Sequence, residues 1–100
     1  MKIKELKENT NASVENVRVV EVGTARTFNK FGKDNRVCSA VIEDSSGKCK
    51  LSLFNEDVEL VKKGQVLNII NGYVKEYKGE LQISRGRNGQ IEIVQSPKTI

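Results

Sequence analysis

One segment with the signals of a helix interrupts a chain whose other apolar segments alternate as β-strands do. Residues Asn55–Gly64 (NEDVELVKKG) begin with a residue that can cap a helix, continue with acidic side chains and end in two lysines and a glycine. Acidic groups stabilise the positive N-terminal end of a helix, lysines stabilise its negative C-terminal end, and glycine favours the stop. Val58 and Val61, with Leu60 beside them, form an apolar side. We therefore expect a short helix that closes one end of a β-structure.

Three extended segments precede this helix. The first, Val14–Phe28, changes the phase of its apolar alternation between Val19 and Val20. Such a change predicts a bulge or strong bend that buries both faces in turn. A long, bent first strand suits a small closed barrel, because one strand must then serve two sheets. The second and third strands are Arg36–Asp44 and Lys48–Phe54, joined by a Ser-Ser-Gly turn.

Two further strands and a closing segment follow the helix. The fourth strand, Gln65–Tyr77, starts with enough apolar residues to be buried on both faces. A tight turn at Lys78-Gly79 leads into the fifth strand, in which Leu81 and Ile83 point into the core while Gln82 and Ser84 point out. We expect Ile91–Val94 to close the sheet.

The order of three strands, one short helix and two strands determines the predicted fold. An SH3-like barrel lacks the helix, and a β-sandwich needs more strands. We therefore predict an all-β protein with the five-stranded OB-fold barrel and one short helix between strands 3 and 4. Residues 13–95 are expected to form this domain, residues 1–12 an N-terminal strap and residues 96–100 a C-terminal tail.

The composition argues against catalysis and against a bound metal. The sequence has no histidine, so the usual imidazole acid–base and nucleophile–histidine chemistry is excluded. Its two cysteines, Cys38 and Cys49, are not closely spaced, which argues against structural zinc, and we expect both to be small buried hydrophobes. We expect no cofactor and no enzymatic activity. The net charge of +4 favours a polyanionic partner, although many soluble domains carry such a charge as a solvated surface.

Aromatic side chains are interleaved with cations on the polar faces of the predicted strands. The third strand ends in a phenylalanine on that face, and the fourth carries two tyrosines on one face, because alternate strand residues point the same way. Aromatic rings stack on unpaired bases while cations attract the backbone, so the expected ligand is single-stranded. The candidate residues on these strands and their turns are Phe54, Tyr73, Tyr77, Lys50, Ser52, Lys75, Lys78, Arg85 and Arg87.

A further group of candidates lies in Asn29–Asn35, which we expect to be a loop between the first two strands. Phe31 lies here among cations, beside a glycine. Two interpretations remain open: Phe31 stacks on a ligand, or it and Phe28 cap the barrel end. The cations of this group are Lys30 and Lys33 in the loop and Arg36 directly after it, at the start of the second strand.

Three motifs carry a family resemblance. They are DSSG at 44–47 with CKLSLF at 49–54, VKKGQV at 61–66, and NGYVKEYKGELQI at 71–83. On these motifs the chain resembles the single-stranded DNA-binding proteins of archaea and their eukaryotic relatives, and the OB domains of archaeal replication protein A. In that family the first motif usually ends in Leu-Trp and the tryptophan stacks on a base; here Phe54 stands in its place. Tyr73 and Tyr77 match further stacking aromatics, and the smaller ring of Phe54 implies weaker binding rather than none.

The resemblance implies a non-catalytic protein that binds single-stranded DNA largely independently of sequence and protects it in replication, recombination and repair. Its partners would be single-stranded DNA and other replication or repair proteins, and it would act as a monomer or as a subunit of a larger complex. The sequence contains neither a membrane-spanning apolar run nor a signal peptide, so we expect an intracellular, cytoplasmic, nucleoid-associated protein without membrane contact. Two alternatives stay open: a protein-interaction subunit of a larger complex, and an RNA-binding OB module.

Overall fold

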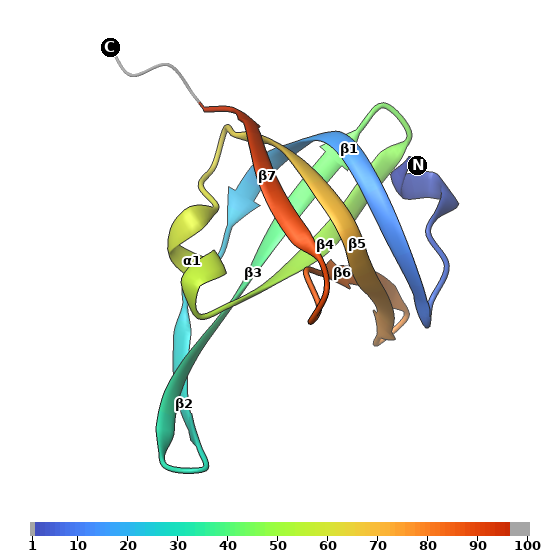
Figure 1. The fold of residues 1–100 in the computed structure, drawn as a ribbon. Coiled ribbons are helices and arrows are strands. Elements are labelled where there is room, and N and C mark those ends of the chain that lie inside the picture. The colour runs from blue at the N-terminus through green and yellow to red at the C-terminus, as the bar shows by residue number, and fades with distance from the viewer. Residues whose placement is uncertain (1, 97–100) are drawn as a thin grey trace.

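A computed structural model describes residues 2–96 as a closed five-stranded barrel with two extra strands and one short α-helix (Figure 1). The barrel order is β1-β3-β4-β6-β5, and β5 pairs back with β1 to close it. Strands β4 and β6 run parallel, and the other neighbouring pairs are antiparallel. The helix lies between the third and fourth barrel strands of the chain, β4 and β5, so the predicted OB-fold class is confirmed. The elements are η1 (Ile3–Glu5), β1 (Thr10–Val22), β2 (Arg26–Lys30), β3 (Lys33–Asp44), β4 (Gly47–Phe54), α1 (Glu56–Leu60), β5 (Val66–Tyr77), β6 (Glu80–Ser84) and β7 (Gln90–Gln95).

Strand β1 bends so that it can pair with β5 along its first part and with β3 along its second. The pairing with β5 shifts register between Val14 and Val17, where Asn16 takes a positive φ of 54°. The pairing with β3 shifts again between Val19 and Glu21. Because of these irregularities, Val14, Val17 and Val19 are all fully buried despite their uneven spacing. The predicted bend in the first strand is confirmed.

The first strand is shorter than predicted, and the loop expected at Asn29–Asn35 is instead a β-hairpin. Strand β1 ends at Val22, and β2 pairs with the start of β3 through a two-residue turn at Phe31 and Gly32. Both turn residues have positive φ, 54° and 77°, as a hairpin turn that follows the strand twist requires. The hairpin extends away from the barrel (Figure 1). Every residue of β2 is exposed, so the strand has no buried apolar face. The sequence of this segment is polar for the same reason, and it therefore suggested a loop.

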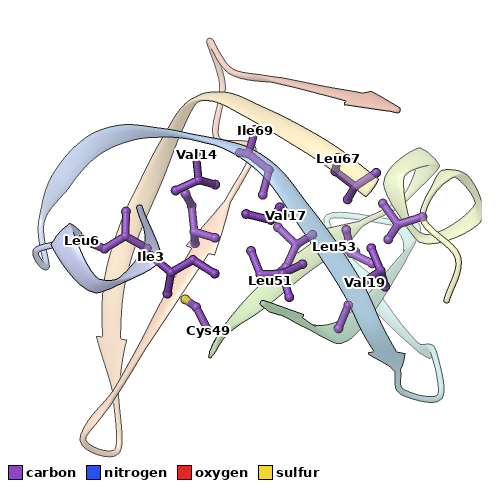
Figure 2. Close-up of a cluster of buried hydrophobic side chains, with 14 of the residues drawn as sticks. Ile3, Leu6, Val14, Val17, Val19, Cys49, Leu51, Leu53, Leu67 and Ile69 are labelled. Atoms are coloured by element: carbon purple, nitrogen blue, oxygen red, sulfur yellow. The ribbon is translucent and has the colours of Figure 1, made fainter. Parts of the chain in front are cut away.

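The apolar side chains of the barrel strands meet inside it (Figure 2). In β4 the inward residues Cys49, Leu51 and Leu53 are buried, as the alternation predicted. Cys38 is buried as well, and burial raises the pKa of the Cys49 thiol, so both cysteines are the small buried hydrophobes that the sequence predicted. The fully buried larger residues of the other strands include Ile42, Leu67, Ile69, Val74 and Ile83.

The N-terminal segment closes one end of the barrel through η1. Ile3 and Leu6 are buried against the core, at the end opposite α1 (Figure 2). The carboxylate of Asp44 anchors this segment, because its Oδ2 accepts a hydrogen bond of 2.8 Å from the backbone N–H of Ile3. Its Oδ1 accepts from the N–H groups of Ser46 and Gly47 at 2.7 and 3.2 Å. Burial opposes ionisation of Asp44, but a hydrogen bond from the Ser46 hydroxyl, together with these backbone hydrogen bonds, outweighs it and holds the pKa of the carboxyl below its ordinary value.

The helix begins differently from the prediction, because the Asn55 side chain does not cap it. Asn55 has φ 52°, and its Oδ1 accepts from the backbone N–H of Arg36 at 3.0 Å. Its Nδ2 donates to Asn35 Oδ1 at 3.2 Å. The amide therefore holds the base of the β2–β3 hairpin against the end of β4 instead of stabilising the helix.

The helix also ends earlier than the predicted Asn55–Gly64, at Leu60. The Gln65 side chain forms hydrogen bonds with the backbone at this point. Its Nε2 donates to Leu60 O at 3.3 Å, and its Oε1 accepts from Lys62 N at 2.7 Å. The next residue, Val61, is extended and almost completely buried in the core. A buried glutamine thus terminates the helix after five residues.

Strand β7 lies outside the barrel ring, and among the described residues it pairs only with β5. The predicted strap comprises η1 and the first residues of β1, and 97–100 of the predicted tail lie outside the described residues. Within residues 2–96, no helix is long and apolar enough to cross a membrane.

Candidate functional site

Phe54 from β4 and Tyr73 from β5 line one depression on the outer face of the barrel. The depression has a volume of about 160 Å³, and the other residues that line it include Ser52, Lys75 and Ser84. Strand β6 runs between the two aromatic residues, because Ser84 pairs with Ser52 on one side and with Tyr73 on the other. Phe54 is 46% exposed, so its ring is accessible at the end of β4. The structure thus brings together four of the predicted site residues, Phe54, Tyr73, Ser52 and Lys75.

A second depression, of about 500 Å³, adjoins the first. The two share Tyr73, Lys75 and Ser84, and the second adds Arg87 from the β6–β7 loop. We call the two depressions together the aromatic groove. Asparagines line its far part, namely Asn11, Asn71 and Asn88.

Tyr77 stands beyond the aromatic groove, near the β5–β6 turn. It pairs with Glu80 across the hairpin, is 60% exposed and lines neither depression. Lys78 Nζ lies 5.4 Å from the Tyr77 ring centroid, and Lys75 Nζ lies 5.8 Å from that of Tyr73. Each tyrosine therefore carries a cation at cation–π distance.

Three of the predicted cations are held in ion pairs with acidic side chains. Lys50 also lines a separate depression near η1 rather than the aromatic groove. Arg85 is directed toward α1, where it neutralises an aspartate that is only 6% exposed. A hydrogen bond from the Arg36 guanidinium, together with its charge, lowers the pKa of Glu59. The pairs are Lys50 Nζ–Glu80 Oε2 at 3.0 Å, Arg36 Nη1–Glu59 Oε1 at 2.7 Å and Arg85 Nε–Asp57 Oδ2 at 3.0 Å.

The remaining candidates lie at the tip of the β2–β3 hairpin, which extends away from the barrel (Figure 1), and none of them lines the aromatic groove. Phe31 is 93% exposed at the turn, with Lys30 Nζ 5.6 Å from its ring centroid and Lys33 directly after the turn. The interpretation in which Phe31 caps the barrel end is wrong, since its ring is almost entirely in solvent. Phe28 lies on exposed β2, is itself 40% exposed and is not among the apolar side chains that pack against the core in the described part of the chain.

Comparison with known proteins identifies the family. Residues 14–94 match the family described as OB-fold nucleic acid binding domain. The chain belongs to this family.

The relatives of this OB-fold domain include single-stranded DNA-binding and replication proteins of archaea. It is 30% identical over 90 residues to the single-stranded DNA binding protein Ssb of Saccharolobus solfataricus, a match that covers 90% of this chain and 61% of that protein. It is also similar to a domain of replication protein A from Methanococcus maripaludis, with a TM-score of 0.78 and 30% identity over 95% of this chain and 94% of the other. The second OB-fold domain of replication protein A from the same organism gives a TM-score of 0.76 and 28% identity over 99% and 98%. The resemblance predicted from the motifs is confirmed.

Sequence reasoning missed several residues of this OB-fold domain's groove. Gln82 accepts a hydrogen bond of 3.0 Å from the Ser52 hydroxyl and lines the groove with Ser84. Both were expected to point outward, but only the parallel register of β4 and β6 places them between Phe54 and Tyr73. The sequence offered no signal for the groove asparagines, because they come from β1, β5 and a loop.

Proposed function

We propose that this domain binds single-stranded nucleic acid, with single-stranded DNA as its main ligand, by stacking unpaired bases on exposed aromatic side chains. The observation that carries the proposal is that Phe54 and Tyr73, far apart in sequence, line one depression with Lys75. A base stacked on an aromatic ring contributes about 1–3 kcal/mol, whichever base it is. Base pairing and stacking in a duplex hide these faces, so a single strand is the ligand that fits.

Tyr77 extends this surface toward the β5–β6 turn and supplies a third aromatic ring, which is exposed, whereas Tyr73 is partly buried. Lys78 beside it and Arg87 at the other end of the groove provide positive charge along the path of a strand. Among the described residues, neither of these two cations forms an ion pair, in contrast to Lys50. They are therefore the better candidates for phosphate contacts.

The relatives support the same ligand and suggest the biological role. The Saccharolobus solfataricus relative is named for single-stranded DNA binding, and the Methanococcus maripaludis domains belong to replication protein A. The chain spans 61% of the length of the former. We propose non-catalytic protection of single-stranded DNA during replication, recombination and repair, together with other proteins of these processes.

Equilibrium titration with oligo-dT tests the proposal, with tyrosine fluorescence as the readout because the chain has no tryptophan. We expect tyrosine fluorescence to be quenched at low salt in the wild type. The triple variant Phe54→Ala, Tyr73→Ala, Tyr77→Ala should lose most of its affinity, and this affinity is measured by the anisotropy of a labelled oligonucleotide. Circular dichroism should be unchanged in the triple variant, because all three side chains lie on the outer face. Val94→Ala, an exposed apolar truncation on β7 that lines neither depression, is the matched control.

The competing functions give different results in the same assay. Tighter binding to single-stranded RNA than to DNA would identify an RNA-binding module. No binding to either nucleic acid would favour the protein-interaction role. Wild-type affinity in the triple variant would contradict the stacking mechanism.

A further inference from the structure

We propose that the larger depression of the aromatic groove takes a single nucleobase and reads its polar edge, so that binding has a base preference at one position. This inference rests on the proposed function, because the base arrives as part of a bound single strand. It goes beyond that function, since stacking alone discriminates little between bases. The observation that carries it is a cluster of three asparagines around a cavity that has Tyr73 on its wall.

The strand register places an amide directly beside the aromatic ring. Asn11 on β1 pairs with Tyr73 on β5, and paired residues of an antiparallel ladder point to the same side of the sheet. Ser84 flanks Tyr73 on the opposite side. A base that stacks on Tyr73 from the side of the larger depression therefore has its edge next to the Asn11 amide.

A second amide enters the cavity from a backbone irregularity in β5. Asn71 has φ 53°, and its backbone N–H donates to Ser13 Oγ at 2.8 Å instead of continuing the strand ladder. Its Nδ2 donates to the backbone oxygen of Asn88 at 3.5 Å. Similarly, Asn11 Nδ2 donates to Gly72 O at 3.5 Å. Both side-chain hydrogen bonds are long, so they hold the two amides at the cavity wall only weakly.

Each of these amides retains hydrogen-bonding capacity for a ligand. An asparagine side chain has two N–H donors and a carbonyl acceptor, and only one N–H of Asn11 and of Asn71 is used within the described residues. A base edge presents the complementary pair of an acceptor and a donor, as adenine does with N7 and the N6 amino group. In a single strand these edges are free of base pairing.

The size and charge of the cavity also fit a nucleotide. Its volume of about 500 Å³ lies within the usual range for small-molecule sites, whereas the adjoining depression has only about 160 Å³. Gly86, with φ 68°, turns the chain after β6 beside Tyr73, and Arg87 follows it at the cavity wall. The Arg87 guanidinium can contact the phosphate of the same nucleotide while the amides contact its base.

Single-position substitution in a DNA ligand tests the inference. The affinity of the full chain is measured for an all-dT oligonucleotide and for the same oligonucleotide with one central dA, dC or dG. We expect the oligonucleotide with one dA to bind at least about fivefold more tightly than all-dT DNA, because an asparagine amide pairs with adenine through two hydrogen bonds. Asn11→Ala should abolish this preference, so that the oligonucleotide with one dA binds no more tightly than all-dT DNA.

Two further variants keep the test decisive. Asn71→Gly removes the second amide at a position where glycine accepts the positive φ, and it too should reduce the preference. Asn29→Ala removes an exposed asparagine of β2 that does not line the cavity, so the preference should persist. Equal affinity for all four ligands in the wild type, or a preference that survives in both cavity variants, would overturn the inference. Failure of every ligand to bind would refute the proposed function itself, and with it this inference.

Discussion

Phe54 and Tyr73 line the same depression although β4 and β5 are not neighbours in the barrel. Strand β6 separates them, and its Ser84 pairs with residues of both strands. The spacing of the two aromatic rings is therefore fixed by three hydrogen-bonded strands, which makes the groove a rigid surface. A preformed surface of this kind saves the ligand part of the entropic cost of binding.

The size of the ring at position 54 should set the affinity for single-stranded DNA. Phe54→Ala should weaken binding about 5- to 100-fold, corresponding to the loss of one stacking contact of about 1–3 kcal/mol. Phe54→Trp should strengthen it, because the larger ring system covers more of a base and the end of β4 leaves room for it. Anisotropy titrations with a short dT oligonucleotide measure both. Equal affinities of all three proteins would exclude Phe54 from the binding surface.

The salt dependence of binding should distinguish free cations from paired ones. Arg87→Gln and Lys78→Gln should each reduce the slope of log affinity against log salt concentration by about 0.7, the value for one phosphate contact on a single strand. Lys50→Gln should change the slope less, because Lys50 is paired with Glu80. The measurement is the affinity at several salt concentrations for each variant. A larger change for Lys50→Gln than for Arg87→Gln would contradict this assignment.

Arg85 should contribute to stability rather than to DNA binding. It pairs with Asp57, a buried residue of α1, so Arg85→Ala leaves a buried carboxylate without its partner. We expect a loss of about 1–3 kcal/mol in the free energy of unfolding, measured with urea. The double variant Arg85→Ala, Asp57→Asn should recover part of this loss, because the uncompensated charge is then absent. Unchanged stability with reduced DNA affinity in Arg85→Ala would reverse the conclusion.

The anchor of the N-terminal segment should make stability fall at low pH. The hydrogen bond from the Ser46 hydroxyl, together with those from the backbone N–H groups of Ile3, Ser46 and Gly47, lowers the folded-state pKa of Asp44. The stabilisation is therefore present in full above the unfolded pKa of about 3.9 and is lost as the pH falls through the folded pKa. Urea unfolding between about pH 3 and 7 should show a shallower pH dependence in Asp44→Asn than in the wild type. An identical acid limb in both proteins would exclude this role for Asp44.

Gly72 should be required for the shape of the groove. A Cβ atom at this position would lie 2.7 Å from the backbone oxygen of Ser84 and 3.0 Å from Ile69 Cγ2. Gly72→Ala should therefore push β6 away from β5 beside Tyr73, with a loss of about 1–3 kcal/mol in stability and weaker DNA binding. Urea unfolding and the oligo-dT titration measure the two effects. Gly47→Ala, at a turn with free space around it, is the control that should leave DNA binding unchanged.

Local sequence was enough to predict the fold class. The alternation in β4, the phase change in β1 and the position of the helix all depend on neighbouring residues, and each corresponds to an element of the barrel. The presence of Phe54, Tyr73 and Lys75 on one surface was likewise predictable, because a strand's period fixes which side chains point outward. The family motifs pointed to the same residues.

Contacts between distant residues decided what local patterns could not. The Gln65 side chain ends the helix early, because its amide forms hydrogen bonds with the backbone of Leu60 and Lys62. The Asn55 side chain accepts a hydrogen bond from the backbone N–H of Arg36 and therefore does not cap the helix. Arg85 and Lys50 do not line the groove, and each forms an ion pair with a carboxylate of another element.

The sequence by itself determined an OB barrel with an aromatic, basic outer face, because strand period and turn chemistry are local properties. Only the tertiary structure decided which cations remain free and that asparagines surround the second depression. Those features depend on the register between strands that are distant in the chain, such as Asn11 opposite Tyr73. Register is set by the packing of all strands around one core, and no short stretch of sequence contains that information.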